Sequence, residues 1–279
     1  MAGLAAARAL VAAGRDVAVL EARDRVGGRL LSHSVGDAGL DLGATWFWAN
    51  EPRVQALVTE LGMSTHPQYL AGDALYQEPR GVQRIQGNPI DGPAGRVTAG
   101  MQALATAMNE RLPSGVVRLG HAVEGIETIE GGVRVHAARR EAADGESVPT
   151  AMEAKAVIVT LPPALAVHAI TFEPELPTPL VDLAAATHVW MGAMTKVVLH
   201  YDRPFWREAG LAGAAISHVG PLREIHDMSG PEGEPAALFG FAPAPRPGAP
   251  TPTAEAVLNQ MGALFGPSAS DPNALLVVD

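Results

Sequence analysis

The sequence predicts an α/β fold, and three features near its N-terminus support this prediction. Residues 17–21 read Val-Ala-Val-Leu-Glu, a short apolar run that ends in an acidic residue. Residues 2–13, before this run, have the composition of a helix, and a double glycine, Gly27 and Gly28, follows it. A helix, a buried parallel strand and a carboxylate at the strand's end are the parts with which a dinucleotide-binding fold holds a ribose. We therefore expect a domain of that kind.

The first elements each carry a signal of where they begin or end. Gly14 suits the left-handed cap at the end of the first helix, and the strand over 16–21 follows as the second strand of a βαβ unit. Asn50 is a suitable N-cap for a second helix, with Pro52 in its first turn. Apolar residues then recur at helical spacing until Gly62 ends the run.

The middle of the chain alternates between strands and helices. We expect irregular strands in residues 63–97, then a helix capped by Thr98 and ended by Pro113. Further strands are predicted over 116–119, 122–129 and 133–138, with a hairpin turn at 131–132. Residues 141–149 are predicted to form a polar loop. Residues 154–160 are almost all apolar, which is typical of a central parallel strand.

The last third of the chain has a mixed pattern. We expect an extended strand over 197–201, a stiff proline-rich loop over 242–252, a helix over 251–264 and a closing strand over 274–278. The regular alternation of helix and strand fades here. This region is therefore predicted to form a smaller α+β part of the protein.

Composition excludes several classes of function. The net charge is −10 and no run is rich in lysine and arginine, so we expect no nucleic-acid partner. The chain has no cysteine, which excludes disulfides and thiolate chemistry, and its histidines lack the spacing of metal ligands. No stretch reaches the ~18 uninterrupted apolar residues of a membrane span. With no visible signal peptide, we expect a cytoplasmic protein.

Four stretches, in order, resemble the flavin-containing amine oxidases, the family of monoamine, polyamine and L-amino acid oxidases. The first joins the helix after Gly3 to the glycines before Arg29. The second is Leu-Asp-Leu-Gly-Ala-Thr-Trp at 40–46, and the third is Val-Ile-Val-Thr-Leu-Pro-Pro at 157–163. The fourth is a strand at 191–199 that contains Lys196, followed by Pro-Phe-Trp. The resemblance spans nearly the whole chain.

The resemblance implies a fold, a cofactor and a reaction. The fold is a Rossmann-like FAD-binding domain of the two-dinucleotide type, with a smaller α+β substrate domain on a mixed sheet. The expected FAD-binding domain comprises residues 1–62 and 98–164, and the expected substrate domain 63–97 and 165–279. The reaction oxidises the C–N bond of an amine to an imine, which hydrolyses, while dioxygen accepts the electrons and becomes hydrogen peroxide. FAD performs this chemistry and the protein orients the reactants.

The FAD contacts that the resemblance implies lie in five segments of the chain. They are Gly3, Glu21, Ala22, Arg23, Gly27, Gly28, Arg29, Gly43, Ala44, Thr45, Trp46, Val123, Thr160 and Pro162. A carboxylate at position 21 can accept both ribose hydroxyls and would repel the 2′-phosphate of NADP. The glycines at 27 and 28 allow a close approach to the pyrophosphate, to which Arg29 adds charge. A loop acid and an ordinary glycine turn with a solvated arginine remain the alternatives.

Lys196 is the expected catalytic residue. Because burying an unpaired charge in an apolar strand is costly, its side chain should face a cavity, a water or a partner. The resemblance places it near flavin N5 through a water, where it assists reoxidation by dioxygen. The alternative is a lysine whose ammonium reaches solvent at a strand edge. Trp46 and Trp48 either line the amine cavity, where aromatic faces attract a cation, or pack in the core.

The sequence is also compatible with two other functions. One is a related flavoprotein, a carotenoid-type desaturase or a renalase-like oxidase of a reduced nicotinamide. The other is a non-catalytic fragment without a complete FAD site. Of the family's Gly-x-Gly-x-x-Gly motif only the last glycine, Gly3, is present, and the family's last FAD-binding segments do not follow Val278. We expect a chain truncated at both ends that holds FAD poorly as it stands, and we assign neither the amine nor the oligomeric state.

Overall fold

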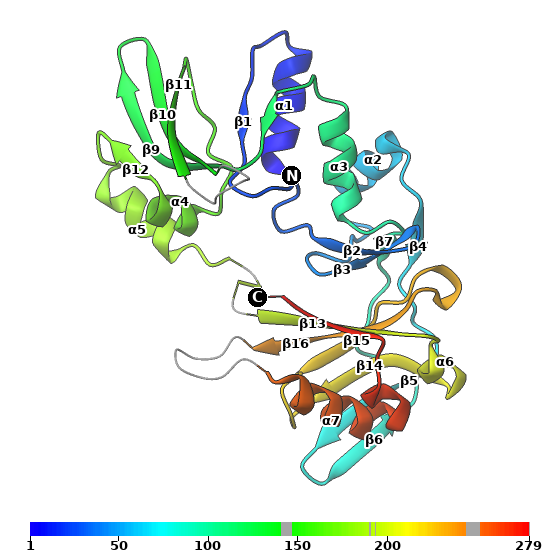
Figure 1. Ribbon diagram of the computed structural model, residues 1–279. Helices are drawn as coiled ribbons and strands as arrows, with labels where there is room; N and C mark the ends of the chain where they lie inside the picture. The colour runs from blue at the N-terminus through cyan, green and yellow to red at the C-terminus, as the bar shows by residue number, and fades with distance from the viewer. Residues whose placement is uncertain (141–146, 190, 193, 244–251, 279) are drawn as a thin grey trace. The chain divides into compact units, whose positions relative to one another are not determined.

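The chain forms two compact units, each with its own sheet (Figure 1). The computed structural model describes residues 1–140, 147–189, 191–192, 194–243 and 252–278. Unit 1 comprises Met1–Gly28 and Ala105–Trp190, and unit 2 comprises Arg29–Leu104 and Met191–Asp279. These units are defined by compactness. The functional domains expected from the sequence, 1–62 with 98–164 and 63–97 with 165–279, stay a prediction.

Unit 1 contains a parallel strand pair and an antiparallel sheet. Its elements are α1 (Ala2–Ala12), β1 (Val19–Leu20), β8 (Val117–Arg118), β9 (His121–Ile129), β10 (Gly132–Arg140), β11 (Ser147–Ala154), α4 (Pro163–Ala169), β12 (Thr171–Glu173) and α5 (Thr178–Ala186). Strand β1 pairs with β8, and the other strands are ordered β11-β10-β9-β12. Ile126, Val135 and Ile170 form the small apolar core of this sheet. The helix after Met1 and the hairpin at Gly131 are confirmed, and Gly14 has the expected left-handed φ of 69°.

The expected central strand over 154–160 is wrong. Ala154 ends β11, and residues 156–160 have no regular secondary structure. Ile158 is 60% exposed, and no described strand pairs with this run. An apolar, β-branched sequence favours a strand, but a strand also needs neighbours for its backbone groups. The neighbouring loop prediction is partly wrong, since 147–149 belong to β11; residues 141–146 lie outside the described part of the chain.

Unit 2 is built on a seven-stranded sheet with the order β17-β13-β16-β15-β14-β5-β6. Its strands are β5 (Asp73–Glu78), β6 (Gly81–Ile85), β13 (Met194–Tyr201), β14 (Leu211–Ser217), β15 (Glu224–Asp227), β16 (Ala236–Pro243) and β17 (Ala274–Val278). The small pairs β2 (Ser32–Val35) with β3 (Ala38–Asp41) and β4 (Thr65–Pro67) with β7 (Gly95–Val97) complete the strands. The helices are α2 (Pro52–Leu61), α6 (Phe205–Glu208), α7 (Ala254–Phe265), η1 (Pro231–Gly233) and η2 (Pro267–Ser270). Helix α3 (Gln102–Glu110) begins in unit 2 and ends in unit 1.

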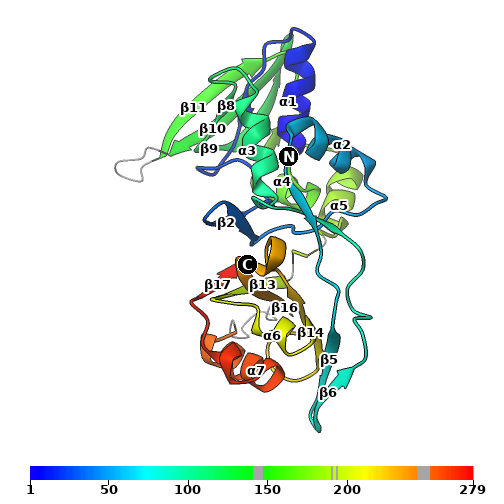
Figure 2. The same ribbon diagram turned by 90° about the vertical axis from the view of Figure 1, so that its right-hand side faces the viewer.

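Both faces of the unit 2 sheet are covered around β13, with α7 on one face and the pair β2 and β3 on the other (Figures 1 and 2). Val197, Leu199 and Tyr201 point into an apolar cluster that includes residues of α7. Val198 points the other way, into a cluster with Leu40 from β3 and residues of β16. Because side chains alternate along a strand, Lys196 shares the face of Val198. The sheet therefore fixes the position of Lys196 from both sides.

The helix expected between Thr98 and Pro113 is α3, but it begins only at Gln102, so Thr98 does not cap it. Three further expected elements can be compared with the structure. The helix ending at Gly62 is confirmed, with the glycine in the left-handed conformation, but Glu51 rather than Asn50 occupies its N-cap position. Helix α7 is confirmed and begins after Thr253, whose side chain accepts a hydrogen bond of 3.2 Å from the Ala256 N–H. Strand β17 has the predicted bounds. The expected loop over 242–252 is partly wrong, since 242–243 belong to β16; residues 244–251 lie outside the described residues.

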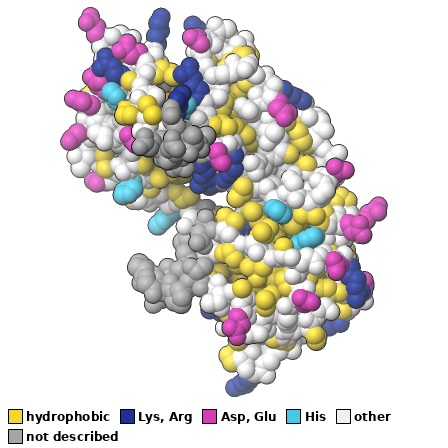
Figure 3. Space-filling view, viewed as in Figure 1, with side chains coloured by type: hydrophobic (Ala, Val, Ile, Leu, Met, Phe, Trp, Pro, Cys, Tyr) yellow, Lys and Arg dark blue, Asp and Glu magenta, His cyan; other side chains and the backbone are white. Residues whose placement is uncertain are grey.

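The surface carries apolar side chains between the charged ones on the face that Figure 3 shows. Several of the large apolar residues exposed in unit 1 come from the run near Ile158 and from α5, where Leu183 is 66% exposed. Within the described residues, no helix has both the length and the apolar character that crossing a bilayer requires.

Candidate functional site

The predicted groups of unit 1 gather around β1 and the first turn of α1. Glu21 follows β1 directly: its N–H donates to the Arg118 carbonyl at 3.0 Å, and its own carbonyl accepts from the His121 N–H at 2.8 Å. Its side-chain Oε1 accepts from the Arg23 N–H at 2.9 Å. The carboxylate therefore lies at the carboxyl end of a parallel strand, which is the position predicted for a ribose ligand.

The first turn of α1 lies beside another predicted residue. A Cβ added to Gly3 would stand 3.1 Å from Thr160 Oγ1 and 3.7 Å from Val19 Cγ1. The structure thus brings together Gly3, Thr160 and the start of β1. The first turn has neither a capping side chain nor an acidic residue, so its N–H groups suit an anion.

The double glycine forms a turn held by two arginines. Gly27 and Gly28 have φ values of 111° and 62°, which residues other than glycine rarely adopt. The Gly28 carbonyl accepts from Arg25 Nη2 at 3.0 Å and from Arg23 Nη1 at 3.4 Å. Sequence reasoning missed Arg25, although the Arg-x-Arg pattern before the glycines could have indicated it. Burial and the neighbouring Arg23 guanidinium lower the pKa of Arg25.

The remaining predicted residues of unit 1 do not gather as closely. Ala22 is exposed beside Glu21, and Pro162 occupies the N-cap position of α4. Val123 packs on the apolar cluster around Ile126, so its contacts in the structure are those of a core residue.

In unit 2 the loop after β3 wraps around the ammonium of Lys196. The ammonium Nζ donates to Thr45 Oγ1 at 2.5 Å and to the Gly43 carbonyl at 3.0 Å. It also lies 4.2 Å from the centroid of the Phe239 ring. The side chain is 6% exposed, so the alternative of a lysine that reaches solvent at a strand edge is not what the structure contains. The loop and the lysine form one buried polar cluster.

Close backbone contacts explain the glycine at position 43. A Cβ there would stand 2.0 Å from the Arg29 carbonyl oxygen. The N–H groups of Gly43 and Ala44 donate to the carbonyls of Leu31 and Arg29, at 2.9 and 3.2 Å. This packing brings Arg29, Gly43, Ala44 and Thr45 to one place. Only a residue without a side chain fits at that point.

The charge balance around Lys196 shifts its protonation. Burial lowers the pKa of Lys196 to about 7, while Asp41 acts to raise it and Arg96 to lower it. Asp41 is fully buried, and burial raises the pKa of its carboxyl. Sequence reasoning missed both Asp41 and Arg96. Asp41 lies in the motif at 40–46, whose acidic residue was the available signal.

Trp46 belongs to an aromatic cluster that borders this polar site. Its ring centroid lies 5.1 Å from that of His226 and 5.3 Å from that of Phe239, and its Nε1 donates to Gln68 Oε1 at 2.8 Å. Trp46 is half-buried, whereas Trp48 is 44% exposed. Sequence reasoning missed Phe239 and Gln68.

His226 is part of a buried ion pair. Its Nδ1 lies 2.6 Å from Asp91 Oδ1, and its Nε2 lies 3.5 Å from Glu224 Oε1. Burial acts to lower the pKa of His226, but the two carboxylates outweigh it and the pKa is raised. The two carboxylates therefore favour the protonated form of the histidine. Within the described residues, no group of three His, Asp or Glu side chains could hold a metal ion.

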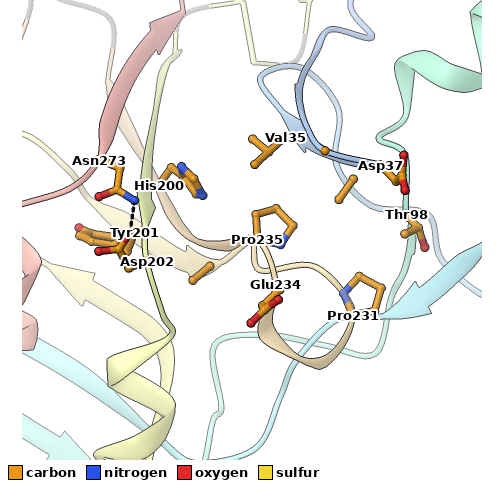
Figure 4. Close-up of a pocket in the computed structure, with 13 residues that line it drawn as sticks. Val35, Asp37, Thr98, His200, Tyr201, Asp202, Pro231, Glu234, Pro235 and Asn273 are labelled. Atoms are coloured by element: carbon orange, nitrogen blue, oxygen red, sulfur yellow. Dashed lines mark hydrogen bonds between the residues drawn. The ribbon is translucent and has the colours of Figure 1, made fainter.

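A groove of about 600 Å³ lies farther along β13, on the side of His200 (Figure 4). Its lining includes the acids Asp37, Asp202 and Glu234, and Asn273 Nδ2 donates to Asp202 Oδ1 at 2.7 Å. None of the predicted site residues lines this groove. It is therefore distinct from the cluster around Lys196.

The carboxylate at the end of β1, the glycine turn at 27–28 and the open first turn of α1 are features of a dinucleotide-binding protein. In unit 2, the buried Lys196 of β13 bound by the loop after β3 adds a candidate catalytic group. Comparison with known proteins identifies the kind of protein. The family model described as flavin containing amine oxidoreductase matches residues 1–93 and 70–279. The chain belongs to this family, its cofactor is FAD and its reaction is the oxidation of an amine.

Relatives and solved structures agree with the family. The chain is 27% identical to putrescine oxidase of Kocuria rosea, over 86% of this chain and 70% of that protein. It is 29% identical to the putative flavin-containing monoamine oxidase AofH of Mycobacterium tuberculosis, over 97% and 79%. Its fold matches cyclohexylamine oxidase of Brevibacterium oxydans with a TM-score of 0.83 and 21% identity, over 99% of this chain and 82% of that one. Wild-type putrescine oxidase bound to putrescine matches with a TM-score of 0.82, 23% identity and the same coverage. The Rossmann-like FAD-binding fold with mixed α/β structure is confirmed.

Proposed function

We propose that this chain oxidises a small aliphatic amine and that Lys196 assists the return of electrons from its flavin to dioxygen. The observation that supports the role of Lys196 most strongly is its buried ammonium, which donates to Gly43 and Thr45 in the loop after β3 and lies beside the Phe239 ring. Burying a lysine ammonium in an apolar strand costs free energy, and here the hydrogen bonds to Gly43 and Thr45 compensate part of that cost. The aliphatic amine follows from the relatives, whose names include putrescine oxidase and cyclohexylamine oxidase.

The groups present fit FAD in each unit. In unit 1 the open first turn of α1 and the turn at 27–28 suit a pyrophosphate, and the carboxylate of Glu21 suits a ribose. We propose that Thr160, Pro162, Val123, Ala22 and Arg23 complete this half. In unit 2, Arg29 and the segment 43–46 are proposed to line the flavin. When bound, FAD accepts two electrons from the carbon beside the amine nitrogen and passes them to dioxygen.

The protein's own residues orient the amine and hold a proton. The rings of Trp46 and Phe239 lie tilted to one another, and aromatic faces attract a cationic amine. Lys196 can bind or release a proton near neutral pH, because its pKa of about 7 leaves both the protonated and the neutral form populated. A positive charge at this place would stabilise the negative charge that dioxygen gains on reduction.

Lys196→Met tests the role of the lysine. Met keeps the length of the side chain but removes the charge, so we expect reduced flavin to react with dioxygen at least about 10-fold more slowly. Lys155→Met is the matched control, because Lys155 is exposed and lies in unit 1. Stopped-flow reoxidation of the two variants, each saturated with FAD, makes the comparison. An unchanged rate in Lys196→Met would remove this lysine from the mechanism.

Glu21→Ala tests the FAD contact of unit 1. We expect a loss of FAD affinity of about 1–3 kcal/mol, the range for a hydrogen bond to a charged group. Glu130→Ala is the control, since Glu130 is an exposed acid in the turn between β9 and β10. Equal FAD affinity in wild type and Glu21→Ala, measured by flavin fluorescence titration, would contradict the assignment. The cytoplasmic location and the lack of a nucleic-acid partner stay predictions.

A further inference from the structure

The carboxylate of Asp41 is held rigidly behind the loop that binds Lys196. Its Oδ1 accepts hydrogen bonds of 2.7 Å from Ser32 Oγ and of 2.7 Å from the Met101 N–H, just before α3. Its Oδ2 is buried and accepts no hydrogen bond from the described residues. A buried carboxylate with a free oxygen is costly unless nearby positive charge compensates it.

Two buried cations interact electrostatically with this carboxylate. The first is Arg96, which is 2% exposed and whose Nη1 and Nη2 donate to the carbonyls of Ser229 and Met228, each at 2.7 Å. The guanidinium is therefore engaged with the backbone that follows β15. The second is Lys196, whose ammonium is bound by Gly43 and Thr45, two and four residues after Asp41. Asp41 thus favours the charged form of both cations, and Asp227 also acts on Arg96.

We propose that Asp41 and Thr45 are positioning residues that together set the protonation state of Lys196. Thr45 accepts a hydrogen bond that only the protonated ammonium and one orientation of the neutral amine can donate. The buried negative charge of Asp41 stabilises the protonated form of Lys196, while the positive charge of Arg96 destabilises it. The role of this protonation state in flavin reoxidation rests on the proposed function, but the effect of Asp41 and Thr45 on the protonation of Lys196 does not.

Within the described residues, the other elements packed around Lys196 bring no further charge to it. The strand registers place Phe241 of β16 and Val278 of β17 opposite Lys196. On β15, His226 forms its own cluster with Asp91 and Glu224, next to the Phe239 ring. Asp41 and Arg96 are therefore the charges that act on the lysine. Burial, then Asp41, then Arg96 is also the order of their effects on the pKa of Lys196.

The chain allows a direct measurement, because it contains two lysines, Lys155 and Lys196. A sample labelled with ¹³C at the lysine ε-carbon gives two side-chain signals, and Lys155→Arg assigns them. The full chain is titrated with and without added FAD, in the absence of amine. We expect the Lys196 signal to titrate with a midpoint near pH 7 in the wild type.

Two substitutions separate the roles. Asp41→Asn keeps the shape and most hydrogen bonds but removes the charge, so the Lys196 midpoint should fall by about 1 pH unit or more. Thr45→Val removes the hydroxyl acceptor and should lower the midpoint by a smaller amount, whereas Thr45→Ser should restore it. The exposed Lys155 signal should not move. A purely structural role of either residue would leave the midpoint of Lys196 in place.

The result that overturns the proposal is a Lys196 midpoint unchanged in both Asp41→Asn and Thr45→Val. If Asp41→Asn does not fold, the Thr45→Val and Thr45→Ser pair decides alone, because equal midpoints in these two contradict the proposal. The pH profile of flavin reoxidation in the same variants should follow the NMR midpoints. Shifted midpoints with an unchanged reoxidation profile would reject the proposed function of Lys196 and leave the present inference standing.

Discussion

Two apolar runs of similar composition adopt different structures in this chain. Residues 157–161 read Val-Ile-Val-Thr-Leu, and residues 195–199 read Thr-Lys-Val-Val-Leu. The first run has no regular secondary structure up to Thr160, and Ile158 is 60% exposed. The second lies within β13, where Val198 is fully buried. Intrinsic propensity ranks the first run higher as a strand, because the second contains a lysine.

The difference lies in the partners. Strand β13 pairs with β16 on one side and β17 on the other, and apolar clusters cover both of its faces. The run at 157–161 pairs with no strand in the described part of the chain. A strand is therefore determined by its neighbours more than by its own residues. The same neighbours explain how β13 tolerates a buried lysine, since they hold the loop that binds the ammonium.

The largest loss of stability should come from the buried polar network next to this sheet. Asp227 accepts from Trp206 Nε1, from Arg207 Nε and Nη2, and from the Ser229 N–H, at 2.7 to 2.8 Å. Asp227→Ala leaves these donors buried and unpaired, so we expect a loss of about 3–5 kcal/mol. Urea unfolding measures it, with the exposed Asp271→Ala as control. A loss below about 1 kcal/mol would contradict the network.

A matched pair of valines tests the comparison of the two runs directly. Val198 is fully buried, whereas Val159 is 40% exposed. Val198→Ala should cost about 2 kcal/mol, for lost burial and the cavity left behind. Val159→Ala should change stability by no more than about 0.5 kcal/mol. Equal losses in the two variants would mean that residues 157–161 are packed as a strand in solution.

The buried lysine should make stability depend on pH in a known direction. Burial lowers the pKa of Lys196 from 10.5 to about 7. Between these values the unfolded chain binds the proton that the folded chain releases, so the unfolded state binds more protons and stability rises with pH. Below pH 7 the cost of burying the charge is present in full. The stability of wild type minus that of Lys196→Met should therefore increase from about pH 7 to pH 10, and a flat or falling difference would contradict the low pKa.

The smallest effect on stability is expected at the exposed end of β1. Glu21 is half-buried and makes one local hydrogen bond, to the Arg23 N–H. Glu21→Gln keeps an acceptor there, so the unfolding free energy should change by no more than about 0.5 kcal/mol. FAD affinity should nevertheless fall, because the charged acceptor is lost. A large loss of stability would show that Glu21 supports the fold rather than a ligand.

The sequence predicted most elements whose signals are local. The cap at Gly62, the hairpin at Gly131 and the bounds of β17 follow from turn chemistry and alternation. The run at 154–160 failed because its outcome depends on strands distant in sequence. Periodicity contains no information about them.

The candidate site shows the same division. The motif at 40–46 and the isolation of Lys196 predicted two parts that the structure brings together through the contacts with Gly43 and Thr45. Asp41 and Arg96 were missed because their importance comes from burial beside the lysine. The pairing of His226 with Asp91 joins two segments that are 135 residues apart in the sequence. Such long-range pairs cannot be read from local spacing.

The most direct test of amine oxidation by this chain is an anaerobic titration of the FAD-saturated protein with a panel of aliphatic amines. The account predicts that at least one amine bleaches the visible absorption of the bound flavin, and that admitting air restores it with formation of hydrogen peroxide. Bleaching by a reduced nicotinamide but by none of the amines would contradict it. So would a folded chain that retains no FAD at all.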